Sequence, residues 1–169
     1  IRTNEGLHER KISHIAQRIA SEYPAKQVTV VSGAAASAKY VFAKRLAIQL
    51  LVSGLDSVTI NLRDYLKDGS KYEELDSIDL DLLKERTDAI LRGESIPTRV
   101  YENGKGYDND HKLLQLKGKS VLLIVGINGI HPNVRNAIGQ NRLLSVYVSA
   151  LSRFNMDWNH RFPTTDLRK

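Results

Sequence analysis

The chain of 169 residues contains no cysteine and only one methionine, one tryptophan and four prolines. Without cysteine there can be no disulfide, thiolate metal site or cysteine nucleophile, which is consistent with a reducing compartment. Hydrophobic runs are short as well: Val121 to Val125 is typical, and such runs cannot span a bilayer. The N-terminus lacks the apolar core of a signal peptide. These absences predict a soluble, cytoplasmic protein with no membrane partner.

Basic residues exceed acidic ones, 25 against 19, which gives a formal net charge of +6. An excess of this sign suits an anionic partner such as a nucleotide, a nucleic acid or an acidic lipid. The lysines and arginines are scattered among acids and form no block, so we prefer an ordinary solvated surface as the interpretation. With 41% hydrophobic residues, a chain of this length is sufficient for one domain with its own core.

Hydrophobic periodicity predicts alternating helices and strands. Three helices are expected, at residues 7–23, 39–53 and 78–92, and four strands, at residues 27–32, 57–62, 119–126 and 143–148. The helix at residues 7–23 is amphipathic and is ended by Pro24. Residues 94–110 are predicted to be a loop that overhangs the site, residues 112–116 a short edge segment, and residues 150–169 a polar tail.

The segment between the first strand and the second helix has the spacing of a phosphate-binding loop, G-x-x-x-x-G-K-[ST]. In such a loop the glycines let backbone N–H groups face the phosphates, the lysine reaches the β- and γ-oxygens, and the hydroxyl holds Mg²⁺. Gly33 and Lys39 stand at the right positions, but Ala38 replaces the second glycine and Tyr40 replaces the hydroxyl residue. The candidate nucleotide-binding residues are Gly33, Ala34, Ala35, Ala36, Ser37, Ala38, Lys39 and Tyr40.

Both substitutions are expected to weaken the site. Alanine favours an ordinary helical start over an anion-binding turn at Ala38, so phosphate affinity should fall. Tyr40 carries its hydroxyl on a long arm, so the metal loses a ligand, unless the ring simply fills the emptied space as core. A surface lysine on a first helical turn then explains Lys39 as well as a phosphate-binding lysine does. ATP or another nucleotide is a candidate cofactor, Mg²⁺ is doubtful, and no metal-ligating residues are assigned.

The order of elements resembles the uridine kinase and phosphoribulokinase group of P-loop kinases, in particular bacterial uridine-kinase-like proteins with an extra N-terminal region. The resemblance covers nearly the whole chain and is strongest in Phe42-Ala-Lys-Arg-Leu-Ala-Ile-Gln-Leu50, Ile78-Asp-Leu-Asp-Leu-Leu83 and Val146-Tyr-Val-Ser-Ala-Leu151 with Pro163-Thr-Thr-Asp166. It implies an α/β, P-loop NTPase-type three-layer α/β/α fold with a mainly parallel sheet. Residues 1–24 would form an N-terminal helix, and residues 25–169 a kinase-like domain without the usual C-terminal lid and closing helices.

The resemblance also implies site residues, and several differ from the family pattern. Arg63 takes the place of an aspartate that would accept the proton of the attacking hydroxyl, which an always-protonated guanidinium cannot do. Asp64 could take over, but neighbours on an extended strand end point to opposite faces, which argues against it. Val125 replaces an acid after the later strand. The implied substrate-side residues are Arg63, Tyr65, Arg99, Tyr101, Asn128 and Arg161, and Arg168 matches the first arginine of the lid.

Three functions remain open at this stage. The preferred one is a uridine-kinase-like domain with a degenerate phosphoryl-transfer site, acting as a weak nucleotide binder or a non-catalytic scaffold with a protein partner. The second is an active ATP-dependent kinase of a nucleoside or similar small alcohol that uses Lys39, Asp64 and Arg168. The third is a basic nucleic-acid-binding module, which only the net charge supports, because no aromatic and basic platform is evident.

Overall fold

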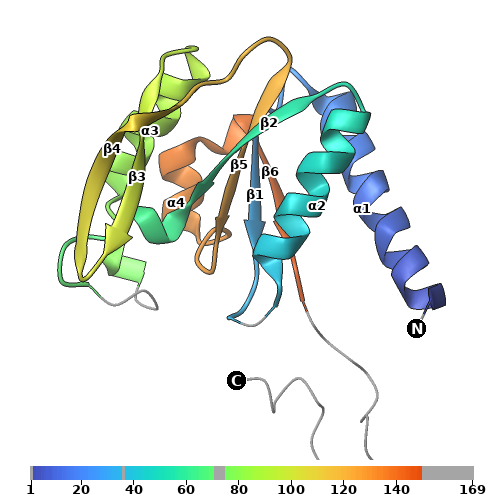
Figure 1. Ribbon diagram of the computed structural model, residues 1–169, viewed down its shortest axis with the longest axis horizontal. Helices are drawn as coiled ribbons and strands as arrows, with labels where there is room; N and C mark the ends of the chain where they lie inside the picture. The colour runs from blue at the N-terminus through green and yellow to red at the C-terminus, as the bar shows by residue number, and fades with distance from the viewer. Residues whose placement is uncertain (1, 36, 71–74, 150–169) are drawn as a thin grey trace, which may run out of the picture.

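The structure, a computed structural model, describes residues 2–35, 37–70 and 75–149. The predictions for the polar tail, and for the site residues Ala36, Arg161 and Arg168, lie outside these ranges. Within them the chain forms a sheet covered by helices on both faces, with a separate β-hairpin at one side (Figure 1).

Four parallel strands make the main sheet, in the order β2-β5-β1-β6. The central strands β1 (Val28–Ser32) and β5 (Ser120–Gly126) are buried along their whole length. Their nearly continuous apolar sequences fit this place, because a parallel sheet is covered by helices on both faces. The edge strands β2 (Asp56–Asn61) and β6 (Leu143–Tyr147) are partly exposed. The four strands predicted from the sequence are confirmed to within one residue at each end.

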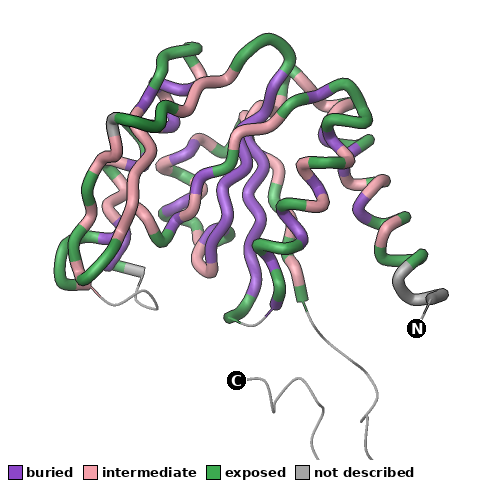
Figure 2. The backbone as a smooth tube through the Cα atoms, viewed as in Figure 1, coloured by how far each residue is buried: buried purple, intermediate pink, exposed green. Residues whose placement is uncertain are grey.

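Helices α1 (Arg2–Glu22) and α2 (Lys39–Val52) cover one face of the sheet, and α3 (Leu80–Leu91) and α4 (Pro132–Ile138) cover the other (Figure 1). Each face has its own buried cluster. Figure 2 shows that the central strands are the most continuously buried part of the chain. On the first face, Ile12, Ala16 and Ile19 of α1 pack in one cluster with Leu46 of α2 and Leu123 of β5. The N-terminal helix is therefore part of the same core as the sheet, and the three-layer α/β/α prediction is confirmed.

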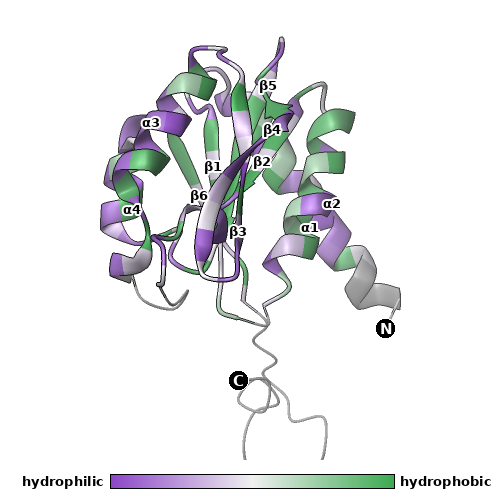
Figure 3. Cartoon of the chain, turned by 60° about the vertical axis from the view of Figure 1, so that its left-hand side comes forward, coloured by the Kyte–Doolittle hydropathy of each residue, from purple (hydrophilic) through white to green (hydrophobic). Residues whose placement is uncertain are grey.

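Residues predicted to be a loop and a short edge segment instead form one long hairpin, β3 (Ile96–Glu102) and β4 (Lys105–Leu114). Its two-residue turn, Asn103-Gly104, has positive φ at both positions, 53° and 79°. This is the geometry of a type I′ turn, for which Asn-Gly is the strongest sequence signal. Pro97, read as a loop residue, borders an irregularity in the pairing, where a missing N–H is tolerated. Figure 3 shows that the hairpin is more hydrophilic than the central strands.

Two short helical elements near the sheet were also missed. The segment after β2 is a 3₁₀ turn, η1 (Leu62–Tyr65), where the sequence suggested an extended strand end. Residues 132–138, for which no helix was predicted, form α4, with proline in its first turn and His131 capping it. Two further 3₁₀ turns, η2 (Leu75–Ser77) and η3 (Gln140–Arg142), complete the described elements. No helix in the described ranges is long and apolar enough to cross a membrane.

Candidate functional site

The segment from Gly33 to Lys39, called the phosphate loop below, leaves the carboxyl end of β1 and enters α2. It is packed against the ends of the two neighbouring strands. Ser32 Oγ donates a hydrogen bond to the carbonyl oxygen of Ile127, beyond β5, over 2.6 Å. A Cβ on Gly33 would lie 2.3 Å from the carbonyl oxygen of Val148, beyond β6, and 2.5 Å from Ser37 Oγ. Only glycine therefore fits at the start of the loop.

Ala38 ends the loop in the left-handed region, with φ 58° and ψ 24°. The expectation of an ordinary helical start at this position is wrong. The chain turns sharply at this position as it passes from the loop into α2. A left-handed residue achieves this turn, at a cost of about 1–2 kcal/mol for a residue with a Cβ. Ala38 thus adopts the left-handed backbone conformation that a glycine at this position of the loop would adopt without steric cost.

Lys39 is 4% exposed and its ammonium lies inside the loop. Nζ donates to the carbonyl oxygen of Ala34 over 3.1 Å and lies 5.2 Å from the centre of the Tyr40 ring. Burial lowers the pKa of Lys39, because the charged form loses hydration. The interpretation of Lys39 as a surface lysine is therefore wrong. The side chain is folded into the loop, where an anion would meet it.

Two further groups in the loop suit a bound phosphate. Ser37 is 6% exposed, and its hydroxyl has no hydrogen-bond partner among the described residues. The N-cap residue of α2, Ala38, makes no side-chain capping bond, and the loop leads directly into the N-terminus of this helix. A buried hydroxyl, a helix N-terminus and a buried ammonium form a set that favours an anion.

The positions where Mg²⁺ would be bound carry no suitable ligands. Tyr40 lies on the first turn of α2 and is 39% exposed, so it does not fill the core as one interpretation suggested. Val125 is fully buried, in the cluster shared with α1 and α2. The part of the chain that the structure describes has no group of three histidine, aspartate or glutamate side chains that could hold a metal ion. Tyr40 and Val125 thus offer a metal ion neither a short hydroxyl nor a carboxylate.

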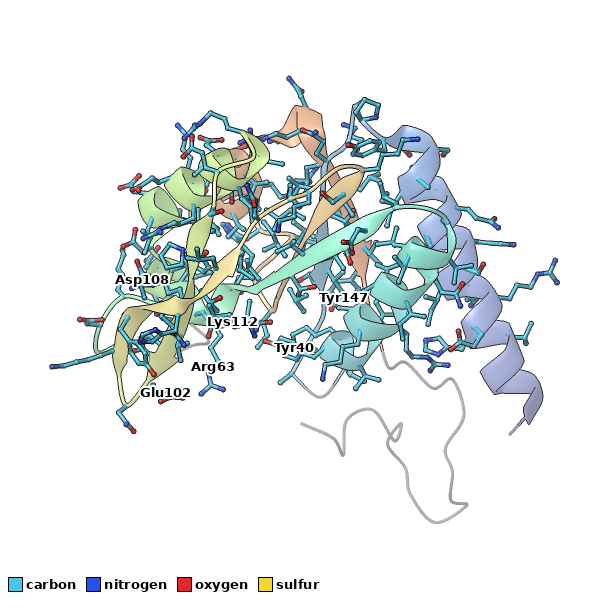
Figure 4. The ribbon with its side chains drawn as sticks, turned by 45° about the horizontal axis from the view of Figure 1, so that its top comes forward. Tyr40, Arg63, Glu102, Asp108, Lys112 and Tyr147 are labelled. Atoms are coloured by element: carbon cyan, nitrogen blue, oxygen red, sulfur yellow. The ribbon has the colours of Figure 1, made fainter. Side chains whose placement is uncertain are left out.

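Beside the loop, between α2 and the hairpin, lies a cavity of about 350 Å³, called the polar pocket below. Its lining residues come from the first turn of α2, the end of β2, η1 and β3: Tyr40, Asn61, Arg63, Asp64, Val100, Tyr101 and Glu102. Figure 4 shows three of them, Tyr40, Arg63 and Glu102, at the same end of the molecule. Because η1 is a 3₁₀ turn, Arg63 and Asp64 line the same cavity, and the argument that they face opposite ways is wrong.

Asp64 is half-buried in this pocket, and burial raises the pKa of its carboxyl group. Four interactions oppose this effect: the Asn61 amide, 3.4 Å from Oδ2, the backbone N–H of Tyr101, and the charges of Arg63 and Arg99. Arg63 is exposed and forms no ion pair with any described residue. The pocket therefore combines a carboxylate of raised proton affinity with an arginine whose guanidinium has no carboxylate partner.

Other predicted substrate-side residues have structural roles. Tyr65 is 2% exposed and belongs to the core, where burial raises the pKa of its phenol to about 12. Arg99 pairs with Asp108 of β4, over 3.3 Å, and packs against Gly106.

Tyr101 lines the pocket, but its hydroxyl donates to the carbonyl oxygens of Lys67 and Ser70, 3.3 and 3.1 Å away. Asn128 lies in the turn after β5, where its carbonyl oxygen accepts the His131 N–H, and it does not line the pocket. Sequence reasoning missed Asn61, Val100 and Glu102 as lining residues. The Asn-Gly turn of the hairpin was the signal that could have placed the last two.

No protein-family model matches the sequence, and no curated protein matches it. Several solved structures are similar in fold. One is a candidate fructose transport system kinase from a Silicibacter species, with a TM-score of 0.66 and 15% identity, covering 80% of this chain and 73% of that one. Another is a candidate uridine kinase from Bacillus stearothermophilus, with a TM-score of 0.63 and 14% identity, covering 82% and 79%.

A third is a D-glycerate 3-kinase from Cryptococcus neoformans var. grubii, with a TM-score of 0.51 and 16% identity, covering 72% of this chain and 52% of that one. All three are named as kinases of small hydroxyl compounds or their transport systems. The chain has the P-loop kinase fold. At these identities the likeness establishes the fold alone.

Proposed function

We propose that this chain is a uridine-kinase-like P-loop domain that binds the phosphates of a nucleotide weakly, without a metal ligand from the loop, and serves as a non-catalytic scaffold. The observation that carries the proposal is the position of Lys39: its side chain is buried, and its ammonium donates to the carbonyl oxygen of Ala34, in the phosphate loop, over 3.1 Å. Burial of the charged ammonium costs hydration free energy, and the negative charge of a bound phosphate would offset part of this cost.

The absent metal ligands argue for binding rather than fast transfer. Phosphoryl transfer depends on positioning and on neutralising the charge that develops on the phosphate oxygens, and Mg²⁺ normally contributes to both. With Tyr40 in place of the hydroxyl and Val125 in place of the acid, the described residues supply only Lys39, Ser37 and backbone donors. These groups are sufficient to bind an anion, but they supply only a small part of the positioning and charge neutralisation that phosphoryl transfer requires.

A second function, an ATP-dependent kinase of a small alcohol, is favoured by one specific observation. Asp64 lies in the pocket beside the phosphate loop and its pKa is raised by burial, as suits a group that accepts a proton. Acceptor-dependent consumption of ATP that is lost in Asp64→Asn would support this function over the scaffold. The sequence argument that excluded Asp64 no longer holds, so the two functions have to be separated by experiment.

The test of nucleotide binding is a calorimetric titration of ATP into the wild type and Lys39→Ala, both in EDTA. A charged hydrogen bond contributes about 1.5–3 kcal/mol, so the variant should bind roughly ten- to a hundredfold more weakly. Its own thermal stability should not fall, since the variant removes a poorly hydrated charge. Lys44→Ala, at an exposed position on the same helix, is the matched control and should bind like the wild type. Equal affinity in all three proteins would refute the proposed role of the loop.

A further inference from the structure

One edge of the main sheet carries a groove that belongs to neither the phosphate loop nor the polar pocket. Among the described residues, β6 pairs only with β1, so it is an edge strand. A cavity of about 420 Å³, called the edge groove below, runs along all five residues of β6. It is also lined by Ile15, Arg18 and Ile19 of α1 and by Arg135 of α4. These two helices cover opposite faces of the sheet, so the groove crosses the sheet edge between them.

The backbone of β6 offers hydrogen bonds along this groove. The N–H of Val148 donates to the carbonyl oxygen of Ser32 over 2.7 Å, so the backbone at Val148 faces β1. The N–H and C=O groups of successive strand residues point to opposite edges, so those of Ser145 and Tyr147 face away from β1. Both residues line the edge groove. A row of backbone groups on a strand edge is a template for pairing with an added strand.

The wall of the groove toward α1 is apolar. Ile15 and Ile19 belong to the same hydrophobic cluster as Leu144 and Val146 of β6, and all four line the groove. Side chains of an added strand that point to this face of the sheet would lie against this cluster. Burial of apolar side chains there is favourable, so the strand should carry apolar residues on this side.

The charges in the groove favour acidic residues on the other side of such a strand. No acidic residue is among the described lining residues. The charge of Arg18 is balanced by Glu22, 3.0 Å away. Arg135 forms no ion pair with a described residue, and its Nε is buried without a hydrogen-bond partner. A carboxylate beside Arg135 would both satisfy this donor and neutralise the charge.

We propose that the edge groove binds an extended segment of a partner protein as an added strand, in which apolar side chains facing α1 alternate with acidic side chains facing α4. The alternation follows because successive side chains in a strand point to opposite faces. The inference rests on the proposed function only in giving the scaffold a partner. Pairing with β6 needs neither Lys39 nor a nucleotide, so the two proposals can fail separately.

Fluorescence anisotropy measures binding of the full chain to a labelled peptide of alternating valine and glutamate, long enough to pair with all five residues of β6. A peptide of alternating valine and lysine is the control for charge. The acidic peptide should bind at least about tenfold more tightly than the basic one, and Arg135→Gln should weaken its binding about tenfold. Arg10→Gln, at an exposed position on α1 outside the groove, should bind it like the wild type. Lys39→Ala should do so too, even if ATP no longer binds.

Ser145→Pro tests whether the peptide pairs with the backbone. Proline removes the N–H that faces away from β1, a loss that edge strands tolerate. The variant should melt close to the wild-type temperature in a thermal scan and lose binding of the acidic peptide, whereas Ser145→Ala should keep both properties. A clearly lower melting temperature in Ser145→Pro alone would show that this N–H is already paired within the chain, and would overturn the proposal. Equal binding of the acidic and basic peptides, or unchanged binding of the acidic peptide in Ser145→Pro or Arg135→Gln, would also overturn it.

Discussion

The phosphate loop and the polar pocket share Tyr40 as a border, but different interactions hold them in shape. The loop is fixed by backbone packing: Gly33 lies against the Val148 carbonyl oxygen and Ser32 Oγ is bonded to the Ile127 carbonyl oxygen. The pocket is defined by side chains on the turn η1 and on the hairpin. A site formed by backbone groups can keep its shape when side chains are substituted. A site lined by side chains changes its chemistry with every substitution in the lining.

This contrast explains which substitutions matter. Ala38 in place of glycine leaves the left-handed turn in place, so the loop still encloses Lys39. Relative to the family that the sequence resembles, Arg63 stands in place of an aspartate, Tyr40 in place of a short hydroxyl and Val125 in place of an acid. We therefore expect the phosphate-binding half of the site to survive and the metal-dependent half to be lost.

The largest effect is expected from Gly33→Ala, which tests whether the backbone holds the loop. The new Cβ would lie 2.3 Å from a carbonyl oxygen, and strand β6 or the loop would have to move. Overpacking of this kind costs about 1–3 kcal/mol of unfolding free energy, and ATP binding should be lost with it. Chemical denaturation measures the first effect and calorimetry the second. Gly6→Ala, where nothing lies within 4 Å, is the control and should not destabilise.

A gain of about 1 kcal/mol is expected from Ala38→Gly, because glycine adopts a φ of 58° without steric cost. Ala47→Gly, in the interior of the same helix, should instead lose about 0.5–1 kcal/mol. Opposite signs in urea denaturation would confirm that the loop imposes a left-handed turn. A loss of stability in both variants would show that α2 starts as an ordinary helix.

The smallest effect concerns the pocket and depends on pH. Burial raises the pKa of Asp64, so above that pKa the folded state bears the cost of an ionised carboxyl, and protonation relieves it as the pH falls. Asp64→Asn should therefore be more stable than the wild type at neutral pH, and the difference should shrink as the pH approaches 3.8 and below. Urea unfolding between pH 3 and pH 7 measures it, with Asp56→Asn, at an exposed position, as the control. A difference that grows toward low pH would contradict the assignment.

The sequence was informative where the signal is a long pattern. Continuous apolar runs at residues 28–31 and 121–125 predicted the central strands, because only strands covered on both faces tolerate them. The stripe with Ile12, Ala16 and Ile19 likewise predicted the buried face of α1.

It was less informative where tertiary packing overrides local preference. Ala38 favours a helical start by itself, yet it is left-handed in the structure, between a loop packed closely at Gly33 and the first turn of α2. The placement of the Asp64 side chain depends on one short 3₁₀ turn, η1. A segment of four residues is too short to show a sequence pattern that separates such a turn from an extended strand end. The hairpin was missed for another reason, since the weight given to Pro97 and to the glycines concealed the Asn103-Gly104 turn signal.

The most direct test of the account is the affinity for ATP with and without Mg²⁺, measured by calorimetry on the wild type and on Tyr40→Thr. The account predicts that Mg²⁺ does not strengthen ATP binding to the wild type, because the described loop offers it no ligand, and that it does so in Tyr40→Thr, which restores a short hydroxyl. Binding to the wild type that becomes at least about tenfold tighter with Mg²⁺, together with turnover of ATP, would contradict the account.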